Sequence, residues 1–331
     1  MPHSKSIALT TGPATTALIE YPRFRELHTE IQLCQHLSKL AGEPHCMSLE
    51  GRTGTGKSTL VRTYAESFRR TQTREGTQVP VLYMEVPSPV GIKDFALTAL
   101  QTLGDPAYDR GTRASMTHRL IGLLKDCEVE LIILDDFQHL IDSETQHILA
   151  EVSDWLKYLI KETGVPFLVV GIEGKVEVIL QANPQLSRLF AARETLRPFA
   201  WDVTQPQTIQ DFSRFVTYVE QIVGKPLAAE PRRVEWLYRL HYATEGIVGN
   251  LMNVMRFAAA LSELQDRAQL DLPLLALAFQ QRLSKHLSGK VNPFTLPAPE
   301  SFTPPVAPAS SAPQTVARRS RSKSPKSLAA A

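Results

Sequence analysis

The sequence predicts an α/β domain, in which helices cover both faces of a parallel sheet, followed by a small all-helical domain. The first observation is that strand-sized runs that are apolar throughout, such as 131–134 and 167–172, alternate with stretches of helical periodicity. Strands without a polar face are typical of parallel sheets buried on both sides. The second observation is that only helical periodicity remains beyond about residue 205. We therefore expect the α/β domain over residues 18–203 and the helical domain over residues 204–290.

Hydrophobic periodicity assigns each element in turn. In the first domain we expect, in chain order, a strand at 45–50, a helix at 58–70, a strand at 79–86, helices at 92–103 and 113–126, a strand at 129–135, a long helix around 148–160 and a strand at 166–171. In the second domain we expect three apolar helix stripes, formed by Phe212, Phe215, Val216 and Val219, by Val234, Leu237 and Leu240, and by Leu251, Val254, Met255 and Ala258.

The composition is that of an ordinary soluble globular protein. Of the 331 residues, 43% are hydrophobic and 21% are charged. The three cysteines have no CxxC spacing, which disfavours a disulfide scaffold or a zinc cluster and favours a reducing compartment. No apolar run approaches a membrane span, and the start lacks the pattern of a secretory signal. We therefore expect a cytoplasmic protein without a membrane partner.

The net charge of +2 is unevenly distributed along the chain. Residues 291–331 carry five basic residues and one acidic residue, a net charge of +4, which leaves −2 for residues 1–290. Proline, serine and alanine dominate this segment, so it cannot bury enough apolar surface to offset its ordering entropy. We expect a disordered basic tail at 291–331 and a flexible leader at 1–17. The tail could either grip phosphates or remain solvated.

The strongest motif is a phosphate-binding loop, Gly51-Arg-Thr-Gly-Thr-Gly-Lys57-Ser58, which matches GxxxxGK followed by Ser or Thr. It lies between an expected strand and an expected helix, the context that the motif requires. Its glycines allow backbone N–H groups to surround a phosphate at the helix N-terminus. The alternative is a glycine turn that binds nothing. The expected nucleotide contacts are Gly51, Thr53, Gly54, Thr55, Gly56, Lys57, Ser58 and Thr59.

Two adjacent acids, Asp135 and Asp136, follow the apolar strand at 129–135. Asp135 is expected at the carboxyl edge of the sheet, where it and the Ser58 hydroxyl would hold Mg²⁺. Lys57 would reach the β- and γ-phosphates of ATP, and Asp136 would orient or deprotonate the attacking water. Two acids after a strand can also be a plain loop or a helix cap. Together with the phosphate loop, they predict binding of ATP with Mg²⁺.

With these motifs the chain resembles the AAA+ ATPases of the TniB/TnsC type, which regulate target choice in transposons. The resemblance covers about residues 18–265 and rests on the phosphate loop and on four further segments, in order Ile19-Glu-Tyr-Pro-Arg-Phe24, Asp135-Asp-Phe-Gln-His139-Leu, Val169-Val-Gly171 with Asn183-Pro-Gln-Leu-Ser-Arg188-Leu-Phe190, and Gly246-Ile-Val-Gly249-Asn. It implies a P-loop AAA+ domain with a helical lid. It also implies that ATP-bound subunits assemble as a ring or filament on double-stranded DNA, recruit a transposase and a targeting adaptor, and disassemble on hydrolysis.

The resemblance also implies a catalytic arginine contributed to a neighbouring subunit. Arg188 is the first choice for this arginine finger, and Arg193 is the second. The alternative is that Arg188 is a helix-surface residue in a minor salt bridge.

Three positions depart from the family pattern. Asp136 stands where most AAA+ proteins have Glu, and its shorter side chain predicts slow hydrolysis. Ile172 and Glu173 follow Gly171 where the family has a small hydroxyl or amide that senses the γ-phosphate. Gly249-Asn250 occupies the region of the usual lid arginine, and Asn250 could contact a phosphate but cannot replace the charge.

DNA contacts are expected on the loops at 87–93 and 105–113, which the resemblance places near the duplex backbone. Cations there would contact phosphates without reading bases. The alternative is that they are ordinary loop charges. The run Arg69, Arg70 and Arg74 has a different explanation, since cations favour a helix C-terminus. The expected DNA-binding residues are Lys93, Arg110, Thr112 and Arg113.

The sequence as a whole predicts an ATP-dependent, DNA-binding regulator of transposition with slow ATP hydrolysis. One alternative is a loader-type or signalling AAA+ ATPase that acts on a protein partner and has no intrinsic DNA binding. Another is a nucleotide-binding scaffold that does not turn over. Tyr21 and Phe24 could bracket the adenine, although aromatics near a domain start are more often packing residues.

Overall fold

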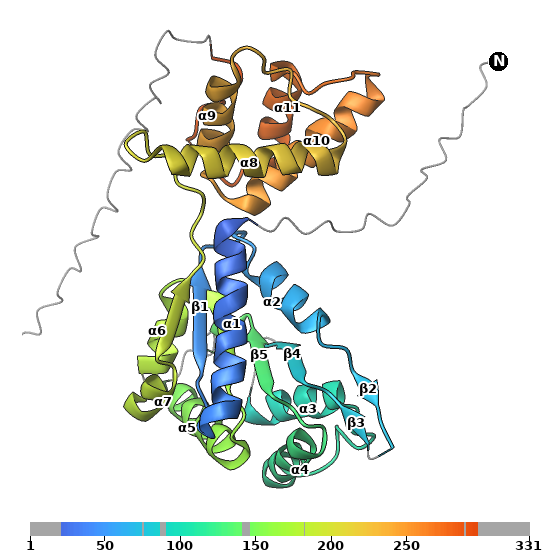
Figure 1. Cartoon of the computed structure of the whole chain (residues 1–331), viewed down its shortest axis with the longest axis vertical. Coiled ribbons are helices and arrows are strands. Elements are labelled where there is room, and N and C mark those ends of the chain that lie inside the picture. The colour runs from blue at the N-terminus through green and yellow to red at the C-terminus, as the bar shows by residue number, and fades with distance from the viewer. Residues whose placement is uncertain are drawn as a thin grey trace, which may run out of the picture.

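The computed structural model describes residues 21–74, 76–86, 91–140, 146–181, 183–287 and 289–296. The expected leader at 1–17, part of the loop at 87–93 and most of the expected tail lie outside these residues. Figure 1 shows a sheet crossed by the long helix α1 (Pro22–Ala41) and a cluster of helices at one end of the long axis.

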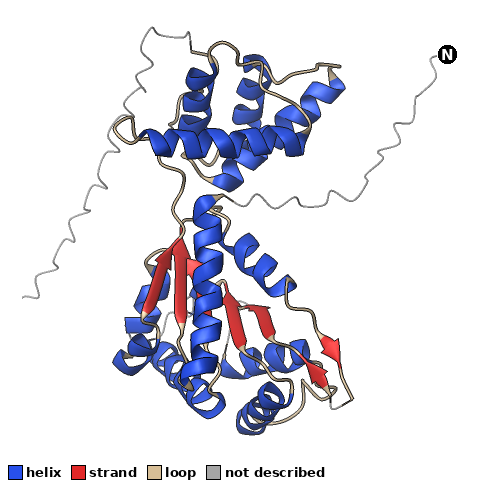
Figure 2. Ribbon diagram, viewed as in Figure 1, coloured by secondary structure: helices blue, strands red, loops and turns tan. Residues whose placement is uncertain are grey.

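A five-stranded sheet with the order β4-β5-β6-β1-β7 forms the centre of the first part (Figure 2). Every pair of neighbouring strands is parallel. The loops that follow β1, β5 and β6 therefore leave from the same edge of the sheet, beside one another. The strands are β1 (Met47–Gly51), β4 (Val81–Glu85), β5 (Leu131–Asp135), β6 (Phe167–Ile172) and β7 (Ala192–Thr195).

Helices cover both faces of this sheet, so the expected fold class is confirmed. Alternate residues of β5 point to opposite faces: Leu131 and Ile133 join one core cluster, and Ile132 and Leu134 join the other. The first face carries α1 and α2 (Lys57–Glu66). The second face carries α3 (Ile92–Leu103), α4 (Arg113–Asp126), α5 (Gln146–Thr163) and α6 (Lys175–Gln181).

The C-terminal helices form the expected all-helical lid, and their core is continuous with the α1 and α2 side of the sheet. The second of the three expected helix stripes differs from the sequence prediction. Val234, which was expected in an apolar stripe, is 65% exposed, and Trp236 is buried instead. The lid helices are α8 (Pro206–Val223), α9 (Arg233–Thr244), α10 (Val248–Leu264) and α11 (Leu272–Arg282).

The residues just after the lid correct the expected start of the tail. Phe294 is buried and packs against Phe279, at 6.4 Å between ring centroids. The fully buried Arg239 side chain donates to the carbonyl of Leu296 at 3.0 Å, and it also contacts the carbonyl of Pro293. A buried guanidinium needs such acceptors, so residues 291–296 belong to the lid.

Local patterns missed several small elements, because short or exposed segments carry little periodicity. These are the hairpin β2 (Thr71–Gln72) and β3 (Thr77–Gln78), the 3₁₀ turn η1 (Phe137–Leu140), α6, α7 (Pro184–Leu189) and the edge strand β7. In addition, α2 ends at Glu66 and not near residue 70. Arg70 caps a different helix, α3, by donating to the carbonyls of Leu103 and Thr102 at 2.7 and 3.2 Å.

Candidate nucleotide site

The phosphate loop joins β1 to α2 at the carboxyl edge of the sheet. Gly54 and Gly56 have φ angles of 82° and 103°, a region that favours glycine. Gly56 precedes α2 and no side chain caps this helix, so its first N–H groups are available to a ligand in the pocket. A helix N-terminus with uncapped N–H groups favours an anion, and these residues therefore fit a phosphate.

The loop lines a cavity of about 540 Å³, a volume typical of small-molecule sites. Its phosphate-loop wall contains Thr53 through Thr59, and Asp136 and Gln138 lie beside it. Its other walls come from the start of the domain, from the end of β6 and from the lid, namely Tyr21, Phe24, Gly171, Ile172, Phe215, Val248, Gly249, Met252 and Arg256.

Tyr21 and Phe24 combine the two roles that the sequence left open. Both line the cavity, and both are also buried in an aromatic cluster. The ring centroid of Tyr21 lies 4.9 Å from that of Phe199 and 5.5 Å from that of Phe215. Burial raises the pKa of Tyr21 to about 12, against a smaller lowering by Arg23. These rings are therefore packing residues that also form an apolar wall of the cavity.

Lys57 is 9% exposed, and its ammonium is held by the loop itself. Its Nζ donates to the carbonyls of Gly51 and Arg52 at 2.8 and 3.0 Å. Burial lowers the pKa of Lys57, although the charges of Asp135, Asp136 and Glu173 oppose this shift. The side chain is thus a preorganised cation at the phosphate-binding end of the cavity.

Asp135 is buried, 1% exposed, at the end of β5. Its carboxylate accepts hydrogen bonds from the Ser58 hydroxyl, from the N–H of Asp136 at 3.0 Å and from the Tyr83 hydroxyl at 3.2 Å. Burial raises the pKa of Asp135, and these hydrogen bonds limit the rise. A hydroxyl next to a carboxylate is the kind of oxygen pair that suits Mg²⁺. Sequence reasoning missed Tyr83, which lies on the neighbouring strand β4 with only a general β pattern to mark it.

Asp136 follows in a left-handed conformation, with φ of 55°. Its Oδ1 accepts a hydrogen bond from the Gln138 amide at 3.0 Å. Gln138 in turn accepts from the N–H of Ile172, at the end of β6, at 3.2 Å. In the sequence, Ile172 and Glu173 stand at the end of β6 in place of a small hydroxyl or amide, but the fold brings the Gln138 amide to this strand end.

The lid contacts the phosphate loop directly. The N–H of Gly249 donates to the carbonyl of Gly54 at 2.8 Å. Arg52 of the loop forms an ion pair with Glu245 of the lid at 2.6 Å, and Lys290 pairs with the same carboxylate at 3.2 Å. Burial opposes ionisation of Glu245, but the hydrogen bonds from Arg52 and Lys290 outweigh it and lower its pKa.

Two lid residues differ from the sequence expectation. The Asn250 amide donates to the carbonyl of Thr244 at 3.2 Å, and Asn250 does not line the cavity. Arg256 does line it, from the same helix. Val248, Met252 and Arg256 are spaced by four residues and form one face of α10. That spacing was the available signal for a cation on the cavity side of the lid.

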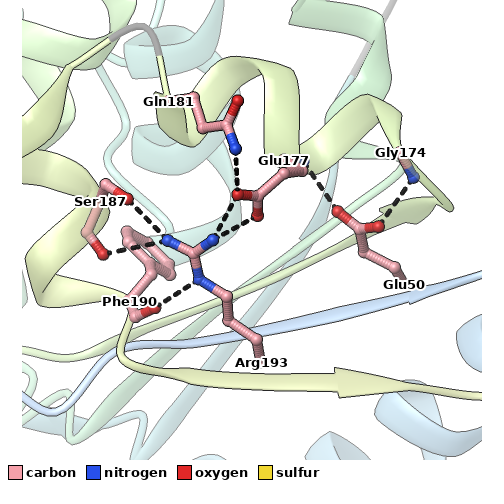
Figure 3. A network of polar contacts seen from close by, with 7 residues as sticks. All are labelled: Glu50, Gly174, Glu177, Gln181, Ser187, Phe190 and Arg193. Carbon is pink, nitrogen blue, oxygen red and sulfur yellow. Dashed lines mark hydrogen bonds and ion pairs between the residues drawn. The ribbon is translucent and has the colours of Figure 1, made fainter.

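The structure separates the two candidate finger arginines. Arg193 occupies the centre of the network in Figure 3, where it pairs with Glu177 and donates to the Ser187 hydroxyl at 2.6 Å and to the Phe190 carbonyl at 3.1 Å. Arg188, on α7, is exposed. Within the described residues no hydrogen bond or ion pair fixes it. The Arg188 side chain is therefore exposed to solvent, whereas Arg193 is bound within its own chain.

The same network also includes Glu50, which is next to the phosphate loop in sequence. Glu50, the residue before Gly51, accepts from the N–H groups of Gly174 and Glu177 at 2.8 and 2.7 Å (Figure 3). It thereby caps α6, which carries the Glu177 partner of Arg193.

The expected DNA-binding residues are exposed, but they differ in the contacts that they form within the chain. Lys93 and Arg110 are exposed. Thr112 is the N-cap of α4 and accepts from the N–H of Ser115 at 3.3 Å. Arg113 pairs with Glu151 at 3.2 Å, with both side chains about half exposed. Arg119 fixes the loop by contacting Asp105 at 2.9 Å and the carbonyls of Ala107 and Arg110 at 2.7 and 2.9 Å.

In the described part of the chain, no helix is both long and apolar enough to cross a membrane. The Nδ1 atom of His139 lies 2.9 Å from the carbonyl oxygen of Val86.

Comparison with known proteins identifies a family and a fold. A model of the family described as bacterial TniB protein matches residues 14–199. The Aeropyrum pernix ORC2 protein in its ADP form has a TM-score of 0.60 at 16% identity, covering 83% of this chain and 73% of that chain. Cdc6p from Pyrobaculum aerophilum has a TM-score of 0.59 at 15% identity, covering 82% and 70%. The Aeropyrum pernix ORC1 protein in complex with DNA has a TM-score of 0.54 at 15% identity, covering 80% and 66%. No curated protein gives a significant match.

Proposed function

Because the chain belongs to the TniB family and is an AAA+ ATPase, we propose that it is an ATP-dependent regulator of DNA transposition. In this proposal, ATP-bound subunits assemble on duplex DNA, recruit a transposase and a targeting adaptor, and disassemble on hydrolysis. Each subunit contributes few phosphate contacts, and assembly adds them together.

The observation that supports ATP gating most directly is the contact between the lid and the phosphate loop. The Gly249 N–H donates to the Gly54 carbonyl at 2.8 Å. A movement of the loop backbone would therefore displace the start of α10. A Cβ at Gly249 would lie 3.1 Å from the Gly54 carbonyl oxygen, so the two backbone segments are closely packed. Nucleotide binding to the loop would therefore set the orientation of the lid and of any subunit that packs on it.

The proposed roles follow from the chemistry of each group. The N–H groups of the loop and Lys57 bind the phosphates. Ser58 and Asp135 hold Mg²⁺, which neutralises phosphate charge when it is bound. Asp136 accepts the proton of the attacking water. Arg188 stabilises the transition-state charge in the site of a neighbouring subunit, and Lys93, Arg110, Thr112 and Arg113 contact DNA phosphates.

Co-sedimentation with duplex DNA, with and without ATP, tests this proposal. We expect ATP-dependent sedimentation of the wild type and none of the Lys57→Ala variant. A protein that hydrolyses ATP but never sediments with DNA would instead be a loader-type or signalling ATPase. DNA coating without phosphate release would identify a scaffold that does not turn over.

A further inference from the structure

We propose that Gln138 is a positioning residue for ATP hydrolysis, whose amide holds the Asp136 carboxylate in the orientation that accepts a proton from water. This inference rests on the proposed role of Asp136. Gln138 lines the nucleotide cavity and is 5% exposed. It bridges the two strand ends that meet there, since it contacts Asp136 after β5 and Ile172 at the end of β6.

The direction of the amide is determined by its partners. The Ile172 backbone N–H is a donor only, so the oxygen of the Gln138 amide must face it, at 3.2 Å. The NH₂ group then faces Asp136 and donates to Oδ1 at 3.0 Å. This hydrogen bond occupies one carboxylate oxygen and limits rotation of the group. The second oxygen, Oδ2, has no hydrogen-bond partner among the described residues and is the one free to accept a proton.

Gly171 makes room for this amide. A Cβ at Gly171 would lie 2.7 Å from the Gln138 amide oxygen and 2.7 Å from Val176. The φ of Gly171 is not in the positive region that favours glycine. Glycine is therefore needed here for space. Gly171 and Gln138 are 33 positions apart in sequence, yet each fits the other at the end of β6.

The short side chain of Asp136 makes positioning important. An aspartate has one methylene fewer than the usual glutamate, so it reaches less far and has fewer ways to find a productive position. A fixed hydrogen bond removes unproductive orientations before the reaction, and misplacement of a catalytic group by about 1 Å can cost about 100-fold in rate.

The experiment compares Gln138→Met, which keeps the bulk and removes the amide, with the matched control Gln35→Met. Gln35 is also a buried amide with two partners, Glu130 at 2.9 Å and the Tyr64 hydroxyl at 2.6 Å, but it does not line the cavity. We expect Gln138→Met to lower kcat by about 10-fold to 100-fold with less than about a twofold change in ATP affinity. Gln35→Met should lower stability and leave kcat unchanged. An equal loss of kcat in the two variants, or none in Gln138→Met, would overturn the proposal.

Gln138→Glu provides a readout that a purely structural role would not change. A protonated Glu reproduces the donor and acceptor of the amide, whereas the ionised form faces Asp136 with a like charge. The ratio of variant to wild-type kcat should therefore rise as pH falls, and a ratio independent of pH would contradict the inference. Asp136→Asn separates this inference from the proposed function. If Asp136→Asn keeps full activity, the role of Asp136 fails; if it is inactive while Gln138→Met is normal, only the role of Gln138 fails.

Discussion

The nucleotide cavity and the expected DNA surface use polar groups in opposite ways. Lys57 and Gln138 line the cavity and Asp135 lies next to Asp136; all three are buried, and each is fixed by partners of its own chain. On the surface, Lys93 and Arg110 are exposed, and Arg113 forms an ion pair in which both side chains are about half exposed. Preorganised groups lose little entropy when a ligand binds, and exposed long side chains lose more. Single substitutions should therefore have large effects in the cavity and small effects on the expected DNA surface.

Arg188 gives the strongest test of this comparison, because it is exposed yet proposed to act in catalysis. We expect Arg188→Ala to lower ATP hydrolysis in the assembled state by about 10³-fold, the range of an arginine supplied in trans. The unfolding free energy should stay within about 0.5 kcal/mol of the wild type. Arg193→Ala should do the reverse, destabilising the fold by about 1 kcal/mol.

Mixing experiments can establish that Arg188 acts between subunits. Arg188→Ala subunits and Asp136→Asn subunits are each expected to be inactive alone. A mixture contains sites with an intact Asp136 from one subunit and an intact Arg188 from the next, so phosphate release should reappear. A mixture that stays inactive would place Arg188 outside the catalytic site.

Lys57→Ala tests the contribution of a buried, preorganised cation in the nucleotide cavity. Loss of a buried cation that binds phosphate should weaken ATP binding by about 100-fold, or about 2.7 kcal/mol. Titration calorimetry with ATP measures this change. Lys39→Ala is the matched control, because Lys39 is exposed, pairs with Glu130 at 2.6 Å and does not line the cavity. Equal ATP affinities in the two variants would show that Lys57 does not contribute to ATP binding.

The surface cations should act weakly and additively. We expect each of Lys93→Ala, Arg110→Ala and Arg113→Ala to lower DNA affinity by only a few-fold, and each to reduce the slope of log K against log salt by about 1. DNA binding at several salt concentrations measures both quantities. Lys161→Ala is the control and should leave the slope unchanged. Lys161 is exposed and lies near the C-terminus of α5, whereas Glu151, the partner of Arg113, lies nearer its N-terminus. A slope that none of the three substitutions alters would exclude this surface.

The contact between the lid and the phosphate loop should show a small pH dependence. The pKa of Glu245 is lowered in the folded protein, so its ion pairs stabilise the fold above the ordinary pKa of 4.5, and this contribution is lost as pH falls through the lowered value. Glu245→Gln should therefore cost about 0.5 kcal/mol at pH 7 and less at a pH below 4.5, where the carboxylate becomes protonated. Urea unfolding at the two pH values measures the difference, and a constant cost would contradict the assignment.

Removal of the basic tail should have the smallest effect. Because Phe294 and the Arg239 acceptors pack on the lid, the deletion should begin at residue 297 and spare residues 291–296. We expect assembly on DNA to persist, with somewhat weaker binding at higher salt. Sedimentation of the truncated protein tests this expectation, and complete loss of DNA binding would transfer the DNA-binding role from the loops to the tail.

Sequence reasoning succeeded best where the information was local. The bounds of α3 and α4 agree with the predicted ranges, since each is one continuous amphipathic stretch. It failed where the partner is distant or the element is short. The explanation offered for Arg70 was correct in kind, but the helix that it caps is α3. Asn250 was considered for a phosphate and instead bonds to Thr244, while Arg256 was overlooked.

The sequence alone determined the fold class, the phosphate loop and the acids at the end of β5. It could do so because these features depend on consecutive residues: backbone conformation over the eight positions 51–58, and an apolar strand that ends in carboxylates. Only the tertiary structure decided that Gln138 meets Gly171, that Arg193 is paired and Arg188 is exposed, and that the lid contacts Gly54. Each of these depends on packing between segments far apart in the chain, and such packing leaves no periodic or local pattern from which it can be read.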